Sequence, residues 1–292
     1  MTLTEATTRT LEVPGATLTY DVRGGGPADA PVLLLIGSPM GAAGFGSLAA
    51  YFTDRTIVTY DPRGSERSTK PDMTSESTPD EHADDLHRII QELGGGPLDL
   101  FASSGGAVNT LALVAKQPGD VRTLVAHEPP LASVLPDRKN AQAAARAVFE
   151  TYQRSGFGAG MAHFIAVVSH QGEFPDEFAQ QPAPDPAMFG MPTQDDGSRT
   201  DPLMGQNIVT GSHYELDFDA LRAAPTRIVM AAGAESEGIL TSRAAFAVAE
   251  RLGTVPVIFP GGHGGFMGGE YGQQGDPDAF AAKLREVLSA EA

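Results

Sequence analysis

The sequence predicts an α/β fold with a mainly parallel central sheet flanked by helices on both sides. Short apolar runs rich in valine, isoleucine and leucine recur along the chain, and they are continuous rather than alternating, which is typical of strands buried on both faces. Segments with helical periodicity separate several of these runs, and such an alternation indicates parallel strands joined by crossover helices. The predicted strands are residues 31–37, 55–61, 98–103, 121–128, 226–233 and 255–262.

The remaining core elements follow from local patterns. Residues 11–23 alternate apolar and polar side chains around Pro14-Gly15, which predicts a β-hairpin at a sheet edge. Residues 80–95 have the spacing of an amphipathic helix, with one apolar face formed by Leu86, Ile89, Ile90 and Leu93. Further helices are predicted over 106–116, 242–253 and 278–290, the last of which closes the chain.

The alternation of strands and helices stops between residues 132 and 222. Because the strand pattern resumes afterwards, we interpret 132–222 as a helical cap, or lid, inserted into a core formed by 1–131 and 223–292. Within the insertion, helical patterns cover 140–156, 158–172 and 205–221, and a proline-rich loop covers 174–202.

The charge of the chain limits its partners. A formal net charge of −17, from 37 acidic and 20 basic residues, argues against binding to nucleic acid or to an anionic membrane, because no basic surface is available to replace counterions. We therefore expect a small-molecule substrate as the partner. The sequence leaves the oligomeric state open, including a homodimer.

Cysteine content and the N-terminal residues bear on compartment and chemistry. The chain has no cysteine, which excludes disulfides, thiol catalysis and cysteine-ligated metals. The first fifteen residues have neither a basic region nor an apolar stretch, and the aliphatic run 32–36 is too short to cross a bilayer. We expect a soluble cytoplasmic protein.

A run of small residues, Ala-Ser-Ser-Gly-Gly at 102–106, lies where a strand must turn sharply into a helix. A turn that exposes a nucleophile needs small residues two positions before and after it, which fits Ser104. Placing Ser103 there would put Phe101 at a small position. The alternative is an ordinary helix start. Backbone N–H groups of Ser38, in the loop after the strand 31–37, and of Gly105 could form an oxyanion hole, whereas Pro39 has no N–H.

A serine nucleophile needs a histidine and an acid. Of the seven histidines, His263 lies in a glycine-rich loop after the last predicted strand, where its ring can reach the carboxyl edge of the sheet. Two carboxylates follow strands and could hold its imidazole, Glu128 and Glu235, and the residues alone leave both open. No second histidine follows His127-Glu128 at the spacing of a zinc helix, so no metal is expected.

These residues together resemble the α/β-hydrolase fold superfamily over nearly the whole chain. The segment TIVTYDPRGSERST resembles the strand and loop of that superfamily with the form Asp-x-Arg-Gly-x-Gly-x-Ser. The resemblance implies a structural role for Asp61, Arg63 and Gly64, and Glu66-Arg67 replaces the usual second glycine region. The stretch 102–130 is similar to zearalenone-hydrolysing lactonases, and this resemblance maps their nucleophile and acid onto Ser104 and Glu128. Unlike those lactonases, this chain has no tryptophan.

The sequence and the resemblance together predict a cofactor-free ester or lactone hydrolase. Ser104 would attack the carbonyl carbon, His263 would take its proton, and Glu128 would orient the imidazole. Alternatives are a non-catalytic ligand-binding protein on the same scaffold, or haloperoxidase-like side activity of the same three residues. We expect the lid to bind a hydrophobic substrate through adaptable apolar side chains. These are Met161, Phe164, Met188, Phe189, Met191 and Met204.

Overall fold

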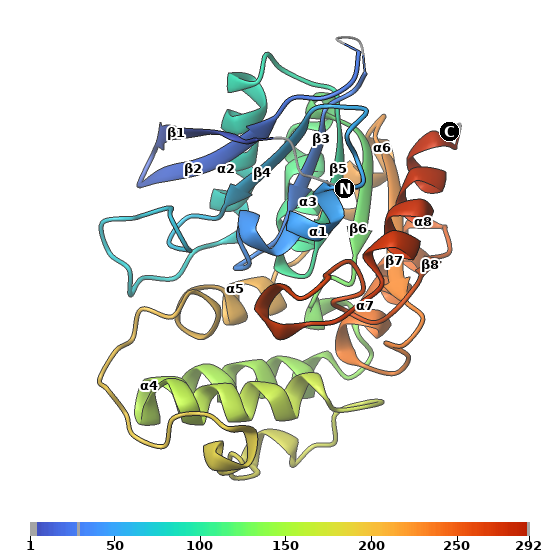
Figure 1. Ribbon diagram of the computed structural model, residues 1–292. Helices are drawn as coiled ribbons and strands as arrows, with labels where there is room; N and C mark the ends of the chain where they lie inside the picture. Colours follow the sequence, from blue (N-terminus) through green and yellow to red (C-terminus); the bar gives the residue numbers. More distant parts are fainter. Residues whose placement is uncertain (1–4, 28–29, 291–292) are drawn as a thin grey trace.

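The computed structural model describes residues 5–27 and 30–290, and one mainly parallel sheet lies at its centre (Figure 1). Its strand order is β1-β2-β4-β3-β5-β6-β7-β8, with β1 and β2 antiparallel and the pairs from β4 to β8 parallel. The strands are β1 Thr7–Val13, β2 Ala16–Arg23, β3 Leu33–Ile36, β4 Ile57–Asp61, β5 Leu98–Ser103, β6 Val121–His127, β7 Arg227–Gly233 and β8 Val257–Phe259.

The predicted fold class is therefore confirmed, and each predicted run contains a strand. The central strands β3, β4 and β5 are buried along their full length, as expected of strands with helices on both faces. The hairpin predicted over 11–23 is formed by β1 and β2, and it turns at Pro14-Gly15. Its first strand begins earlier than predicted and lies at the edge of the sheet.

Helices cover both faces of this sheet. Leu111 and Val248 belong to the apolar core on one face, whereas Leu48 and Leu284 belong to the core on the other. The first face is covered by α2 Pro79–Glu92, α3 Gly105–Lys116 and α7 Leu240–Leu252, and the second by α1 Gly46–Ala49 and α8 Pro277–Ser289.

Local signals explain where these helices begin. The Thr78 side chain accepts a hydrogen bond from the Glu81 N–H and Glu81 reaches back to the Thr78 N–H, which forms a capping box at the start of α2. Asp276 caps α8 in a similar way through the N–H of Ala279. In both helices proline occupies the first turn, where its missing N–H costs no hydrogen bond.

The segment between β6 and β7 is helical, and its largest element is α4 Arg138–Val168. This element covers most of the two helices predicted over 140–156 and 158–172, and it breaks at Gly156, whose φ of 81° is not helical. Residues 174–202 are mostly loop with short turns of 3-10 helix, η4 Phe178–Gln180 and η5 Pro186–Phe189. Figure 1 shows α4 beyond one end of the sheet, with this loop largely on the far side of α4.

The prediction of a single helix over 205–221 is wrong. The chain forms a π-helical turn, η6 Pro202–Asn207, followed by α5 Ile208–Ser212 and, after a non-helical stretch, α6 Phe218–Ala223. The Asp217 carboxylate accepts the N–H of Ala220 and so starts α6 as a separate helix.

Hydrogen bonds attach this segment to the core. The His82 ring of α2 contacts the Asn207 side chain at 2.8 Å between Nε2 and Oδ1, and the Ser77 N–H donates to the Gln206 carbonyl at 2.9 Å. α5 contacts both α3 and α4, so it lies between the core and α4 (Figure 1). None of the helices in the described residues is long and apolar enough to span a membrane.

Candidate active site

Ser104 lies at the sharp turn between β5 and α3. Its backbone has φ 59° and ψ −131°, a conformation that residues with a side chain rarely adopt and that is typical of a nucleophile turn. The N–H of Ser104 donates to the His127 carbonyl at 3.0 Å, which fixes the turn to the neighbouring strand β6. The serine therefore stands directly before the first turn of α3, where backbone N–H groups favour negative charge.

Ser103, the other serine of the pair, has a different environment. It ends β5, is almost fully buried, and its hydroxyl lies 3.1 Å from Nδ1 of the equally buried His127. A substrate cannot reach a side chain in that position. The two serines therefore differ in burial, since Ser103 is buried and Ser104 is half-buried.

The backbone of Gly105 lies against the loop that follows β3. A Cβ atom added at Gly105 would be 2.6 Å from the carbonyl oxygen of Ser38, so only glycine fits without a shift of that loop. The backbones of Ser38 and Gly105, the two residues predicted to supply oxyanion donors, are therefore close neighbours.

Glu128 follows the last residue of β6 and contacts His263. Its Oε2 lies 2.7 Å from Nδ1 of the His263 ring, and the carboxylate has no exposed surface. The Glu128 N–H donates to the Ala231 carbonyl at 3.0 Å, and its φ of 49° turns the side chain from the strand direction towards the histidine loop. His263 itself is 41% exposed, so its ring is open to solvent on one side.

The Glu128 carboxylate is held as an anion. Burial by itself would raise its pKa, but hydrogen bonds from the His263 ring and from the Gly233 N–H lower that pKa to about 2. The Gly233 N–H donates to Oε1 at 2.8 Å. At neutral pH this carboxylate can therefore fix the imidazole and stabilise its protonated form.

A second histidine lies beside the first. The rings of His127 and His263 stack with centroids 6.1 Å apart and an interplanar angle of 28°. Burial lowers the pKa of His127 to about 4, so its ring is neutral at physiological pH. The rest of its surroundings is aromatic, formed by Phe101, Phe259, Phe266 and Phe280.

The other candidate acid, Glu235, does not contact His263. Glu235 is exposed, and its backbone N–H donates a hydrogen bond to the Gly261 carbonyl at 3.0 Å. Within the described residues its carboxylate forms no hydrogen bond or ion pair. The structure thus brings Glu128 and His263 together and leaves Glu235 at the surface.

Comparison with known proteins identifies the family. A family model described as the alpha/beta hydrolase fold matches residues 30–209. The chain belongs to the α/β-hydrolase fold family. It is 30% identical over 287 residues to the uncharacterized hydrolase YraK of Bacillus subtilis (strain 168), covering 97% of this chain and 96% of that protein.

Two further proteins resemble this chain over a shorter stretch or at lower identity. A 2-(acetamidomethylene)succinate hydrolase of Mesorhizobium japonicum is 33% identical over 119 residues, 40% of this chain and 41% of that protein. The crystal structure of carboxylesterase CesB (YbfK) from Bacillus subtilis aligns with a TM-score of 0.66 at 16% identity, over 99% of this chain and 93% of that chain. At that identity the likeness shows the fold.

In this α/β-hydrolase the loop after β4 supports the turn after β3. Asp61 accepts the Ala42 N–H at 2.8 Å, and Arg63 forms a two-point ion pair with Asp85 at 2.7 Å. Glu66, where the superfamily resemblance places glycine, has a φ of 49°. Its carboxylate accepts a hydrogen bond from Tyr271 at 3.1 Å, which links this loop to the one that carries His263.

The predicted substrate-contacting residues differ in burial. Met204 is fully buried and lies close to Gly160, whereas Met188 is 76% exposed. Met161 and Phe164 are half-buried on α4 and pack against the core. Phe189 is exposed and Met191 is half-buried in the loop beyond α4.

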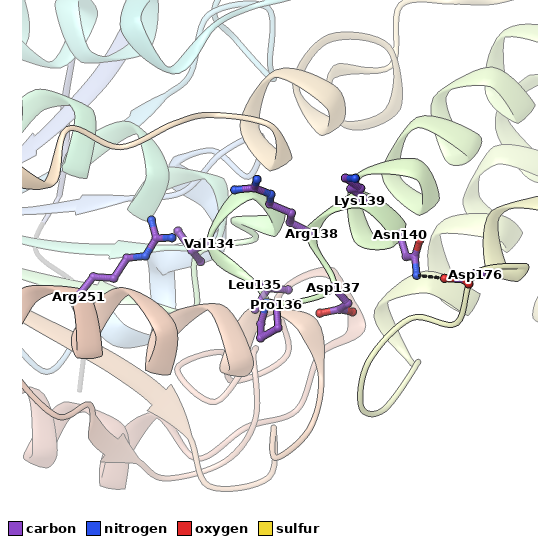
Figure 2. Close-up of a pocket in the computed structure, with 9 residues that line it drawn as sticks. All are labelled: Val134, Leu135, Pro136, Asp137, Arg138, Lys139, Asn140, Asp176 and Arg251. Atoms are coloured by element: carbon purple, nitrogen blue, oxygen red, sulfur yellow. Dashed lines mark hydrogen bonds between the residues drawn. The ribbon is translucent and has the colours of Figure 1, made fainter.

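A surface cavity of about 640 Å³ lies at the start of α4 (Figure 2). Neither Ser104 nor His263 lines it, so it is separate from the candidate active site. Among residues 5–27 and 30–290 no group of three or more histidine, aspartate or glutamate side chains is arranged to hold a metal ion.

Sequence reasoning missed two contacts of the Glu128 carboxylate, the Gly233 N–H and the Thr241 hydroxyl, which lies 3.1 Å from Oε2. Gly233 ends β7 and Thr241 lies in the first turn of α7, and neither position has a distinctive local pattern. They could be found only once β6, β7 and α7 were placed side by side.

Proposed function

We propose that this α/β-hydrolase is a serine hydrolase that cleaves an ester or lactone of a hydrophobic small molecule. The observation that carries the proposal is the 2.7 Å contact between the buried Glu128 carboxylate and Nδ1 of His263. That contact leaves Nε2 of the same ring available for proton transfer. The family assignment and the similarity to a protein named as a hydrolase support this reading.

The first half of the reaction forms an acyl-enzyme. The Ser104 hydroxyl oxygen attacks the carbonyl carbon while Nε2 of His263 takes the hydroxyl proton, and the N–H groups of Ser38 and Gly105 stabilise the negative oxygen of the tetrahedral intermediate. When the intermediate collapses, the C–O bond to the alcohol breaks and His263 donates its proton to the leaving oxygen.

The second half releases the acid. His263 removes a proton from a water molecule, the resulting hydroxide attacks the acyl carbon, and the bond to Ser104 breaks as its oxygen takes the proton back. With a lactone the leaving alcohol stays attached to the acyl chain, so the product is a single hydroxy acid.

Residues 132–222 are proposed to act as the cap of this site. The segment begins four residues after Glu128 and attaches to the core through α5 and η6. The half-buried side chains of Met161 and Phe164 on α4 are suited to an apolar substrate, because methionine and phenylalanine offer adaptable and large apolar surfaces.

Labelling with a fluorophosphonate probe tests the proposal. We expect covalent labelling at Ser104, followed by hydrolysis of some members of a panel of aryl esters, macrolactones and 2-(acetamidomethylene)succinate. Ser104→Ala should abolish labelling and lower kcat by about a million-fold. Ser103→Ala is the matched control and should retain most activity. A folded parent protein that neither labels nor hydrolyses would refute the proposal.

A further inference from the structure

Three donors from three separate elements converge on the Glu128 carboxylate. Its Oε1 accepts the Gly233 N–H at the end of β7, and its Oε2 is shared by the His263 ring and the Thr241 hydroxyl. The distances are 2.8 Å from Gly233, 2.7 Å from His263 and 3.1 Å from Thr241. The hydroxyl of Thr241 is the only side-chain donor besides His263 recorded on this carboxylate in the described residues.

We propose that Thr241 is a positioning residue that fixes Glu128 and, through it, the orientation of His263. The inference rests on the proposed function, because it assigns Thr241 a task in the same reaction. Within the described residues the Thr241 hydroxyl donates to Glu128 and forms no hydrogen bond to Ser104, Ser38 or Gly105, so it acts through the acid.

The geometry explains why this hydroxyl matters. A glutamate side chain can rotate about its carboxylate bond, and a carboxylate that rotates changes the direction in which it holds an imidazole. Donors on both oxygens remove this freedom, since Gly233 holds Oε1 and Thr241 holds Oε2. His263 is 41% exposed, so packing does not fix its ring as firmly as it fixes His127.

Thr241 lies where the Glu128 side chain, which comes from the end of β6, meets the first turn of α7. Glu128 reaches its place from the end of β6, where it crosses towards β7 and the start of α7. Ile239, before α7, offers no side-chain cap, and the buried anion beside the first turn of this helix complements its positive end. Thr241 thus joins the acid to the helix that lies next to it.

Replacing Thr241 by valine tests the inference, because valine keeps the shape of threonine and removes the hydroxyl. We expect Thr241→Val to lower kcat about tenfold while KM for an aryl ester stays unchanged. We also expect the acid limb of the kcat/KM profile to move to lower pH, because a carboxylate that is no longer fixed against the ring stabilises the imidazolium less. Thr241→Ser should restore both properties.

Thr226→Val is the matched control. Thr226 is a buried threonine next to β7, and its hydroxyl donates to the Val121 carbonyl at 2.8 Å and is not bonded to Glu128. This variant should lower Tm without moving kcat or the pH profile. The downfield proton signal of the His263–Glu128 hydrogen bond gives a readout that needs no substrate, and it should change in Thr241→Val alone.

The outcomes separate the inference from the proposed function. A parent protein that labels at Ser104, together with a Thr241→Val variant whose kcat, pH profile and proton signal equal those of the parent, would overturn the role of Thr241 only. Equal impairment of Thr241→Val and Thr241→Ser with loss of the native melting transition would assign the residue a purely structural role and overturn it as well. A parent that does not label would overturn both proposals.

Discussion

Ser103 and His127 lie opposite each other in the parallel ladder of β5 and β6, each one residue before a member of the candidate active site. The Ser103 hydroxyl contacts Nδ1 of His127 at 3.1 Å, and both residues are buried. The next residues, Ser104 and Glu128, both have positive φ angles. The register of two neighbouring strands therefore sets Ser104 and Glu128 at the same edge of the sheet.

The identity of the acid can be decided by two isosteric substitutions. Glu128→Gln should lower kcat by about ten-thousand-fold at neutral pH, because the amide cannot stabilise the imidazolium or fix its tautomer. Glu235→Gln should stay within about tenfold of the parent, since its carboxylate is exposed and forms no hydrogen bond or ion pair with the described residues. Both variants are measured in one ester assay, with circular dichroism to check the fold, and the reverse ranking would move the acid to Glu235.

The close approach of Gly105 and Ser38 predicts a defect in transition-state stabilisation. In Gly105→Ala the new Cβ would meet the Ser38 carbonyl oxygen at 2.6 Å and displace the loop with the second oxyanion donor. We expect kcat to fall by about a hundredfold or more with little change in KM. Gly119→Ala is the control, because a Cβ there meets no atom within 4 Å. Normal kcat in Gly105→Ala would show that the oxyanion site lies elsewhere.

Buried neutral histidines predict a loss of stability in mild acid. The pKa of His127 is lowered by burial from 6.5 to about 4. Between these values the unfolded chain binds a proton that the native protein does not, so the free energy of unfolding falls as pH falls through this window. The maximum loss from one such histidine is about 3 kcal/mol. Burial lowers the pKa of His82 to about 4 as well.

Urea unfolding at pH values from about 7 to 5 measures this effect. In His127→Phe the free energy of unfolding should depend less steeply on pH than in the parent, because one of the buried histidines with a lowered pKa has been removed. The absolute stability of the variant does not affect the comparison, since the slope is the measured quantity. An unchanged slope would mean that His127 does not contribute to the pH dependence.

Two methionines that the sequence treats alike should behave differently. Met204→Ala removes a fully buried side chain and should lower the free energy of unfolding by about 2–5 kcal/mol. Met188→Ala should change it by about 0.5 kcal/mol or less, because this side chain is 76% exposed. Chemical denaturation measures both. KM values for short-chain and long-chain esters, measured on the same variants, show whether either residue contacts substrate.

Much of the fold could be predicted because its signals are local. Continuous apolar runs identify strands buried on both faces, and the small residues around Ser104 identify a sharp turn, since each depends only on neighbours along the chain. Proline and glycine mark where helices start and break, as at Pro79 and Gly156. The failed helix over 205–221 shows the limit, because a local cap at Asp217 divided it.

The sequence by itself determined which residue types were available for the site, namely a serine in a small-residue turn, a histidine in a late loop and two carboxylates. Tertiary structure placed Glu128 and not Glu235 against His263, because residues 135 positions apart in the chain meet only through the pairing of β6, β7 and β8. It also placed Thr241 on the acid, buried Met204 and exposed Met188. Hydrogen bonding and burial are properties of neighbours in space, so no local pattern could specify them.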